Sequence, residues 1–380
     1  MSGETWTYIG IGVAVVFAIA GAVLLITSRD DGRQARPDSR PARNSFRQGA
    51  DDQPPPKKRV AVIVNPTKFE DLDETRRTLA AVCAEHDWDE PLMLETTVHD
   101  VGYGQTRQAL EEGVDLVCAL GGDGTVRAVG EELIGTGTPF GLLPGGTGNL
   151  LARNLELPVD DLGKAMAVAL TGRNRRIDAA WMTLDPEDDD LVLEEGAGEN
   201  SSSGERRHAF FVMAGLGLDA AIMDSTSEEL KKRIGWAAYV PSGFAHWLTD
   251  RFRVTITCDG GDTETRRARM VVIGNCGKIT GGIDLMPEAE PDDGLLDIIV
   301  LSPPGVAAWA SVAARVVTRS DRTSSTLSRS RCGAATVTVD EHQRVQVDGD
   351  IIGEASRLSV EIEPRALIVR TPSAKGGAGA

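Results

Sequence analysis

The sequence predicts an α/β domain followed by an antiparallel β-sandwich domain, behind an N-terminal transmembrane helix. Strand and helix patterns alternate over residues 59–176, strand patterns dominate residues 177–372, and residues 8–26 are apolar and uncharged. Alternating strands and helices form a mainly parallel sheet covered by helices, whereas a run of short strands closes into a sandwich or barrel. A length of 380 residues suits two such domains with an N-terminal extension.

Residues 8–26 predict a membrane anchor, because about twenty apolar residues cross the hydrocarbon layer as a helix. A cleaved signal peptide is the alternative, but such peptides carry positive charge before the apolar run, and here only Glu4 is charged. Arginines recur through residues 29–47, which places the remainder in the cytoplasm. We therefore expect a single-pass cell-membrane protein with a cytoplasmic catalytic part, an anchor at 1–28 and a disordered linker at 29–58.

The charge balance excludes a nucleic-acid partner. The net charge is −17, and no basic stripe that could follow a phosphate backbone occurs in the part expected to fold. The five cysteines are scattered without a C-x-x-C pair, which predicts reduced core residues rather than metal ligands or disulfides. An acidic stretch at 185–207 predicts a long solvated loop, and residues 373–380 a featureless tail.

The α/β domain is predicted from elements in a fixed order. Strands are expected at residues 59–66, 91–97, 116–120 and 140–143, and helices at 70–86, 105–113 and 160–172. Ligands of such sheets bind beyond the carboxyl ends of the strands. The polar residues at those ends are Asn65, Thr97, Asp123 and Thr147.

Two glycine-rich turns end the third and fourth of these strands. The first consists of Gly121, Gly122, Asp123, Gly124 and Thr125, and the second, P-G-G-T-G-N at 144–149, contains Gly146, Thr147 and Asn149. Glycine lets backbone N–H groups approach an anion, and a following helix adds its positive end. The pair of turns predicts a polyphosphate ligand.

Asp123 does not fit the role of a phosphate ligand, because its carboxylate repels phosphates. It would fit beside Mg²⁺ or a ribose hydroxyl. The alternative is an aspartate that caps the following helix.

The second domain is predicted from short strands. They are expected at residues 177–184, 209–214, 252–258, 268–274, 295–301, 335–340, 344–347, 358–362 and 366–370, with helices at 219–233, 235–248 and 305–318. Most neighbours in such a run pair antiparallel.

The chain resembles the diacylglycerol kinase and sphingosine kinase superfamily of lipid kinases, whose nucleotide-binding fold NAD kinases share. The resemblance spans residues 59–370 and rests on seven ordered motifs. They are V-N-P at 64–66, G-G-D-G-T at 121–125, P-G-G-T-G-N at 144–149, I-D-A-A at 177–180, A-G-L-G-L-D-A at 214–220, P-D-D-G-L-L-D at 291–297 and V-D-G-D at 347–350. NAD kinases share the first glycine turn but not the later motifs.

The resemblance implies ATP and Mg²⁺ as cofactors and assigns roles to individual residues. Asn65 and Thr97 match positions that line the ATP site, with Thr96 as the alternative to Thr97. Residues 121–127 match the loop over the ATP phosphates, and Thr147 matches the hydroxyl of the second turn. Asp178 matches an acidic residue that organises the site or contacts the substrate hydroxyl. A metal is expected at Asp293 with the backbone carbonyls of Glu290 and Leu295, unless residues 292–294 are only a turn.

The general base of the family lies in a V-D-G-E motif, where this chain has V-D-G-D. Asp350 occupies the position of the base, and Asp348 lies two residues earlier. A carboxylate there can take the proton of an acceptor hydroxyl. Either aspartate could serve, and a D-G pair is also an ordinary hairpin turn.

The resemblance therefore predicts an ATP-dependent kinase for the hydroxyl of diacylglycerol or a related lipid at the membrane. Leu150 stands where many bacterial diacylglycerol kinases have an aspartate, so a sphingoid-base kinase is an alternative. Two further alternatives are a kinase related to NAD kinase that acts on soluble substrates, and a non-enzymatic membrane protein that senses nucleotide. The sequence leaves a homodimer open.

Overall fold

The computed structural model describes residues 57–184, 206–217, 251–261, 263–279, 284–303 and 327–373. These residues belong to one compact unit, Lys57–Ala380. The predicted anchor, the linker before Lys57, most of the acidic loop, the helices expected at 219–233, 235–248 and 305–318, and the end of the tail lie outside the described residues.

Among the described residues, no helix is both long enough and apolar enough to cross a membrane. The longest of them, α2 (Leu72–Glu85), has 14 residues. At about 1.5 Å per residue it covers only roughly two thirds of the hydrocarbon layer. This finding contradicts the predicted single-pass location with a cytoplasmic catalytic part. The segment on which that prediction rested, residues 8–26, lies outside the described residues.

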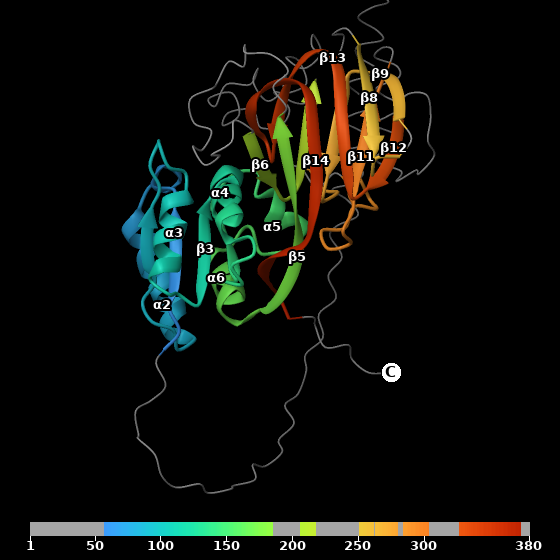
Figure 1. Cartoon of the computed structure of the whole chain (residues 1–380). Helices are drawn as coiled ribbons and strands as arrows, with labels where there is room; N and C mark the ends of the chain where they lie inside the picture. Colours follow the sequence, from blue (N-terminus) through green and yellow to red (C-terminus); the bar gives the residue numbers. More distant parts are fainter. Residues whose placement is uncertain are drawn as a thin grey trace, which may run out of the picture. The chain divides into compact units, whose positions relative to one another are not determined.

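The N-terminal part is a parallel α/β sheet, as predicted (Figure 1). Its strands are β1 (Val60–Val64), β2 (Leu92–Glu95), β3 (Leu116–Gly121) and β4 (Phe140–Pro144), and they lie in the order β2-β1-β3-β4. Its helices are η1 (Pro66–Lys68), α2, α3 (Tyr103–Glu111), α4 (Asp123–Leu133), α5 (Leu150–Asn154) and α6 (Leu162–Thr171). All four carboxyl ends of the strands therefore meet at one edge.

Side chains alternate between the two faces of the parallel sheet, and helices cover both faces, so this part has three layers. Ala61 and Ile63 of β1 pack in the same core cluster as residues of α3, α4 and α5, whereas Val60 and Val62 pack in the cluster that contains residues of α2 and α6. Both faces of the sheet are thus apolar, which is typical of parallel sheets covered by helices. Asp71 and Asp161 accept hydrogen bonds from backbone N–H groups in the first turns of α2 and α6, which fixes where these helices begin.

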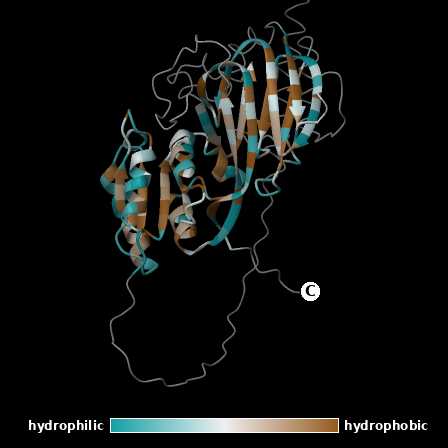
Figure 2. Cartoon of the chain, in the orientation of Figure 1, coloured by the Kyte–Doolittle hydropathy of each residue, from teal (hydrophilic) through white to brown (hydrophobic). Residues whose placement is uncertain are grey.

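The C-terminal part is antiparallel, as predicted, and its strands are banded in hydropathy (Figure 2). The strands are β5 (Arg173–Leu184), β6 (Arg206–Phe210), β7 (Met213–Gly217), β8 (Phe252–Cys258), β9 (Thr263–Ala268), β10 (Met270–Gly274), β11 (Leu296–Leu301), β12 (Leu327–Cys332), β13 (Ala334–Val347) and β14 (Asp350–Thr371). β9 and β12 were not predicted. The strand expected at 209–214 is two strands, separated at Phe211 and Val212.

β13 and β14 are longer than the sequence suggests. Each was predicted as two short strands, but β13 continues through a register shift between Thr338 and Gln343. β14 pairs antiparallel with β13 and β5, and its end pairs parallel with β4 at Val369 and Phe140. A bulge bends a strand without ending it, so the broken hydrophobic pattern did not mark a true end.

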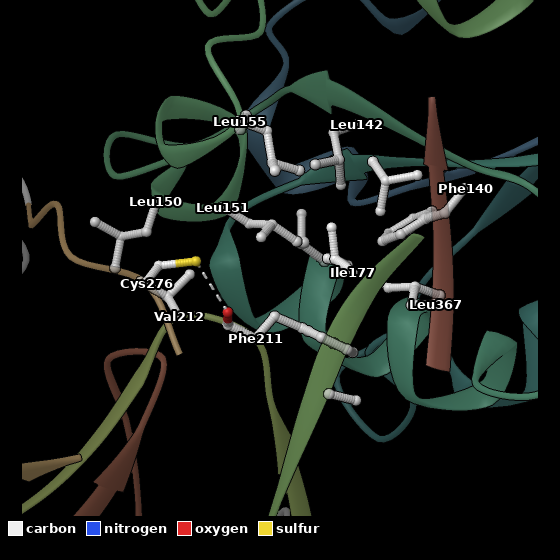
Figure 3. Packing of buried hydrophobic residues seen from close by; sticks show 14 of the residues in the cluster. Phe140, Leu142, Leu150, Leu151, Leu155, Ile177, Phe211, Val212, Cys276 and Leu367 are labelled. Atoms are coloured by element: carbon white, nitrogen blue, oxygen red, sulfur yellow. Dashed lines mark hydrogen bonds between the residues drawn. The ribbon is translucent and has the colours of Figure 1, made fainter. Parts of the chain in front are cut away.

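β14 therefore joins the two parts into one hydrogen-bonded sheet. A single core cluster follows the same path: Phe140 of β4, Phe211 before β7 and Leu367 of β14 all belong to it (Figure 3). Leu150, Leu151 and Leu155 pack there too, so the helix behind the second glycine turn is anchored in the shared core. This arrangement brings residues 347–350 to the edge that carries the glycine turns.

Candidate active site

The two glycine turns pack backbone against backbone. β3 and β4 pair in parallel up to Gly121 and Pro144, so the turns that follow them are neighbours. A Cβ on Gly145 would lie 2.7 Å from the backbone nitrogen of Gly121, and a Cβ on Gly146 would lie 2.7 Å from the Cα of Gly122. A backbone cannot move aside as a flexible side chain can. Gly145 and Gly146 are therefore required by the contact between the turns.

Gly122 differs from the other glycines of the turns because its missing side chain faces open space. A Cβ there would meet nothing within 4 Å, and its φ of −84° suits any residue. Gly122 precedes α4, whose N-terminus has no side-chain cap. The first N–H groups of a helix lack partners within the helix and carry its positive end. The space in front of Gly122 and α4 suits an anion.

Asp123 ties the first glycine turn to the second. Its Oδ1 accepts a hydrogen bond from the backbone N–H of Leu150 at 2.7 Å. The predicted capping role is thus seen at α5 rather than at α4. Burial raises the pKa of Asp123 to about 6, the Leu150 N–H acts in the opposite direction, and the charges of Asp348 and Asp350 raise it further.

A pH dependence follows for Asp123. Its pKa is higher in the folded protein than in the unfolded chain, so the folded protein binds more protons between about pH 4 and 6, and stability falls as the pH rises through that window. We expect the free energy of unfolding of wild type, relative to Asp123→Asn, to decrease from about pH 4 to 6 and then to level off. Urea unfolding across this range measures the difference. A flat difference would contradict the assigned shift.

Asp348 is buried and holds a loop in place. Its Oδ2 accepts from the backbone N–H of Phe211, and its Oδ1 from those of Val212 and Met213, each at 2.9 Å. Burial raises the pKa of Asp348, and these three N–H groups act in the opposite direction. Both oxygens are therefore occupied by the backbone between β6 and β7.

Asp348 and Gly349 also form the turn that joins β13 to β14. Both residues have positive φ, 47° and 94°. Two consecutive positive φ values are the mark of a tight hairpin turn with the twist of its strands. The D-G pair thus forms a hairpin turn, the alternative that its sequence allows, and this turn places Asp350 at the start of β14.

Asp350 stands over the first turn of α4. A Cβ on Gly124 would lie 2.8 Å from its Oδ2. The same oxygen accepts a hydrogen bond from Arg127 Nη2 at 3.0 Å. The Asp350 side chain is 47% exposed and that of Arg127 only 10%, so the carboxylate faces solvent from a buried cationic support. The sequence alone does not indicate this pair, because 223 positions separate the two residues and no local pattern links them.

The first turn is braced from within by Thr125. This residue is buried, and a Cβ on Gly121 would lie 2.7 Å from its Oγ1. In the second turn, Asn149 adopts a left-handed conformation with φ 48°. Its side chain accepts from the N–H of Gly146 and donates to the Gly146 carbonyl. Thr125 and Asn149 therefore shape the turns, whereas Thr147 is exposed.

The remaining residues predicted to line the nucleotide site lie at the same edge of the sheet. The backbone N–H of Asn65 donates to the Leu120 carbonyl at 3.0 Å, which places Asn65 beside the first glycine turn. Its side chain accepts from Thr67. Thr96 is buried and Thr97 is exposed, with its Oγ1 accepting from the Asp100 N–H. Exposure favours Thr97 of the two as a ligand contact.

Asp178 is fully buried, and backbone groups occupy both of its oxygens. Oδ2 accepts from the N–H of Gly294 at 2.7 Å and Oδ1 from that of Arg365 at 2.6 Å. Asn275 donates to the carbonyls of Asp178 and Phe211 and so links this region to the loop held by Asp348. These contacts suit an organising role and leave no free oxygen for a substrate hydroxyl.

The residues predicted to hold a metal do not fit one as they are placed. Asp293 Oδ1 accepts from the Leu295 N–H at 3.0 Å, and its Oδ2 pairs with Arg331. The guanidinium thus already neutralises the carboxylate predicted to bind a metal together with the carbonyls of Glu290 and Leu295. Within the described ranges, no group of three or more His, Cys, Asp or Glu residues could hold a metal ion.

Comparisons with known proteins match both halves of the chain. Residues 59–182 match the family model of the diacylglycerol kinase catalytic domain. Residues 212–371 match that of the YegS C-terminal NAD kinase beta sandwich-like domain.

Two curated relatives show the extent of the similarity. A protein of Pseudomonas aeruginosa named "Probable lipid kinase YegS-like" is 30% identical over 306 residues, which cover 77% of this chain and 89% of that protein. "Uncharacterized protein sll0036" of Synechocystis is 26% identical over 267 residues. That match covers 69% of this chain, which spans just over half, 56%, of the Synechocystis protein.

A solved structure is also similar. It is a diacylglycerol kinase of Bacillus anthracis, with a TM-score of 0.59 and 20% identity. The superposition covers 83% of this chain and 98% of the other. At this identity the likeness shows a shared fold alone.

Proposed function

We propose that this chain, which belongs to the family of the diacylglycerol kinase catalytic domain and the YegS-like lipid kinases, transfers the γ-phosphoryl group of ATP to the hydroxyl of a lipid. Family membership supports a kinase, and the lipid acceptor, diacylglycerol in the first instance, is the proposal. One observation carries it: Asp350 stands over the uncapped N-terminus of α4, where the glycine turns leave space for an anion.

The glycine turns would hold the phosphates. The open space at Gly122 and the first N–H groups of α4 suit the β- and γ-phosphates, since both the free donors and the helix dipole favour negative charge. Asn65, Thr97 and Thr147 lie at the same edge and would contact the rest of the nucleotide. Phosphoryl transfer requires positioning and charge stabilisation above all, which a preformed cradle supplies.

Asp350 rather than Asp348 would take the acceptor proton. Asp348 has both oxygens hydrogen-bonded to the backbone, whereas Asp350 binds Arg127 through Oδ2 and has a half-exposed side chain. A base must lie within hydrogen-bond reach of the proton that it removes. Arg127 would orient the carboxylate, and Oδ1 of Asp350 would accept the proton of the lipid hydroxyl as its oxygen attacks the γ-phosphorus. The bond from the γ-phosphorus to the β,γ-bridging oxygen would break, and ADP would leave.

Magnesium would enter with ATP, whose phosphate charge it offsets. Carboxylates are the ligands that Mg²⁺ prefers, and those of Asp123 and Asp350 lie at the glycine turns. The charges of Asp348 and Asp350 both raise the pKa of Asp123, after the larger effect of burial. Of these carboxylates, only that of Asp350 is paired with a described arginine, Arg127. The turns therefore carry excess negative charge that a cation brought by the nucleotide would balance.

The acceptor lipid is tested by offering ATP with diacylglycerol, sphingosine or NAD in mixed micelles and measuring phosphorylated products. We expect phosphate on diacylglycerol and its loss in Asp350→Asn. Phosphate on sphingosine alone would favour the sphingoid-base reading that Leu150 suggests. Phosphate on NAD alone, or on no acceptor despite ATP binding, would contradict a lipid kinase.

A further inference from the structure

The loop before β11 is held by an arginine where the family resemblance predicts a metal. Arg331 of β12 lies opposite Asp297 of β11 in the antiparallel register. Its guanidinium pairs with the carboxylates of Asp293 and Asp297, the second through Nε at 3.3 Å. Its Nη2 also donates to the Glu288 carbonyl at 3.4 Å. One cation thus contacts two carboxylates and a carbonyl oxygen.

Carboxylate and carbonyl oxygens are the type of ligand that a hard divalent cation takes from a protein. They come from three places in the chain, residues 288, 293 and 297, which fold around one point. We propose that Arg331 takes the place of a structural divalent cation here, so that this chain fixes the loop at residues 288–297 without a metal.

Charge supports this assignment. Asp297 is buried and pairs with Arg331, Asp293 pairs with the same guanidinium, and Glu288 lines the same cavity as Asp297. Two carboxylates therefore share the positive charge of one arginine, Arg331. A buried carboxylate left without a partner is strongly destabilising, so the loop needs a cation of some kind.

The loop at residues 288–297 is linked by hydrogen bonds to the candidate active site. The neighbouring backbone is tied to Asp178 through the Gly294 N–H and the Pro291 carbonyl. Asn275 joins Asp178 to Phe211, and Phe211 donates to Asp348. Arg331 and the loop at residues 288–297 therefore form one end of a continuous set of contacts that reaches the hairpin carrying Asp350. The inference itself does not depend on the proposed activity.

A cavity of about 200 Å³ makes the proposal testable by substitution. Its lining includes Met286, Glu288, Asp297, Arg329 and Arg331. A volume of this size has room for a hydrated ion once the guanidinium is removed. Replacing Arg331 by methionine should therefore turn a metal-independent loop into a metal-dependent one.

Thermal unfolding of the full chain tests this. Wild type should melt at the same temperature in EDTA and in 10 mM CaCl₂ or MgCl₂. Arg331→Met should melt roughly 5 to 10 °C lower in EDTA. A saturable amount of Ca²⁺ or Mg²⁺ should recover at least half of that loss, and Arg331→Met with Asp293→Asn should recover none. Isothermal titration with CaCl₂ should show one site in Arg331→Met and none at this loop in wild type.

Two further variants separate the charge from the fold. Arg331→Lys keeps a cation and should melt between wild type and Arg331→Met without responding to divalent ions. Arg344→Met removes an exposed ion pair with Glu354 elsewhere in the same part of the protein and should melt like wild type. The proposal is wrong if wild type binds a divalent ion in a way that Asp293→Asn abolishes, or if Arg331→Met melts like wild type. Equal stabilisation of Arg331→Met and its Asp293→Asn double variant by divalent ions would also overturn it.

Discussion

Asp350→Asn is expected to lower the turnover number by about 10²- to 10⁴-fold while the affinity for ATP and the melting temperature stay near those of wild type. The carboxylate is half exposed and makes a hydrogen bond to Arg127, which an asparagine oxygen can still accept. The amide cannot take a proton, so the loss falls on the chemical step. Product formation under saturating ATP and lipid, together with ATP titration, separates the two effects.

Asp348→Asn should lower the stability of the fold, in contrast to Asp350→Asn, which should lower turnover. An amide NH₂ would replace one of the two oxygens that accept three backbone N–H groups, so a buried donor would face a donor. We expect the free energy of unfolding to fall by about 1–3 kcal/mol. Glu354→Gln, an exposed carboxylate of β14, is the matched control and should change neither quantity. Full turnover in Asp350→Asn, with loss of turnover at normal stability in Asp348→Asn, would move the base to Asp348.

Gly122→Ala is expected to fold like wild type and to bind ATP about 100-fold more weakly. The added methyl group meets no protein atom within 4 Å, so it occupies the space proposed for the phosphates. A methyl group there would separate a phosphate from the backbone N–H groups, and a hydrogen bond to a charged group is worth about 1.5–3 kcal/mol. ATP binding by calorimetry and melting by circular dichroism measure the two quantities.

Gly146→Ala should also lose ATP binding, but because the added methyl group disturbs the packing of the two turns. Its methyl group would lie 2.7 Å from the Cα of Gly122, and overpacking of this kind costs about 1–3 kcal/mol. We therefore expect a lower melting temperature together with lost ATP binding. Gly163→Ala in α6 is the control, because its nearest atoms lie 3.5 Å and 3.9 Å away. Normal ATP affinity in a folded Gly122→Ala protein would rule out the phosphate site proposed here.

Local patterns predicted most of the α/β part. The apolar runs that end at Val64, Gly121 and Pro144 are strands because both of their faces are covered by helices, and such strands read as continuous apolar stretches. The antiparallel part was harder to read. β9 carries T-E-T-R-R-A, with little apolar character, and is held by pairing with β8 rather than by a core of its own.

The candidate site was also predictable only in part. The sequence predicted its residue types, because glycines at strand ends and a carboxylate in V-D-G-D have local signals. The different roles of Asp348 and Asp350 were not predictable, since the two positions of one hairpin differ only in which side chain the loop at 211–213 covers.

The sequence by itself determined where the glycine turns lie and that helices follow them, because both depend on neighbouring residues. Only the tertiary structure decided that Arg127 supports Asp350, that Gly146 packs on Gly122, and that Arg331 pairs with Asp293. These contacts join residues far apart in the chain. Strand register and core packing bring them together, and neither is encoded within a short stretch of sequence.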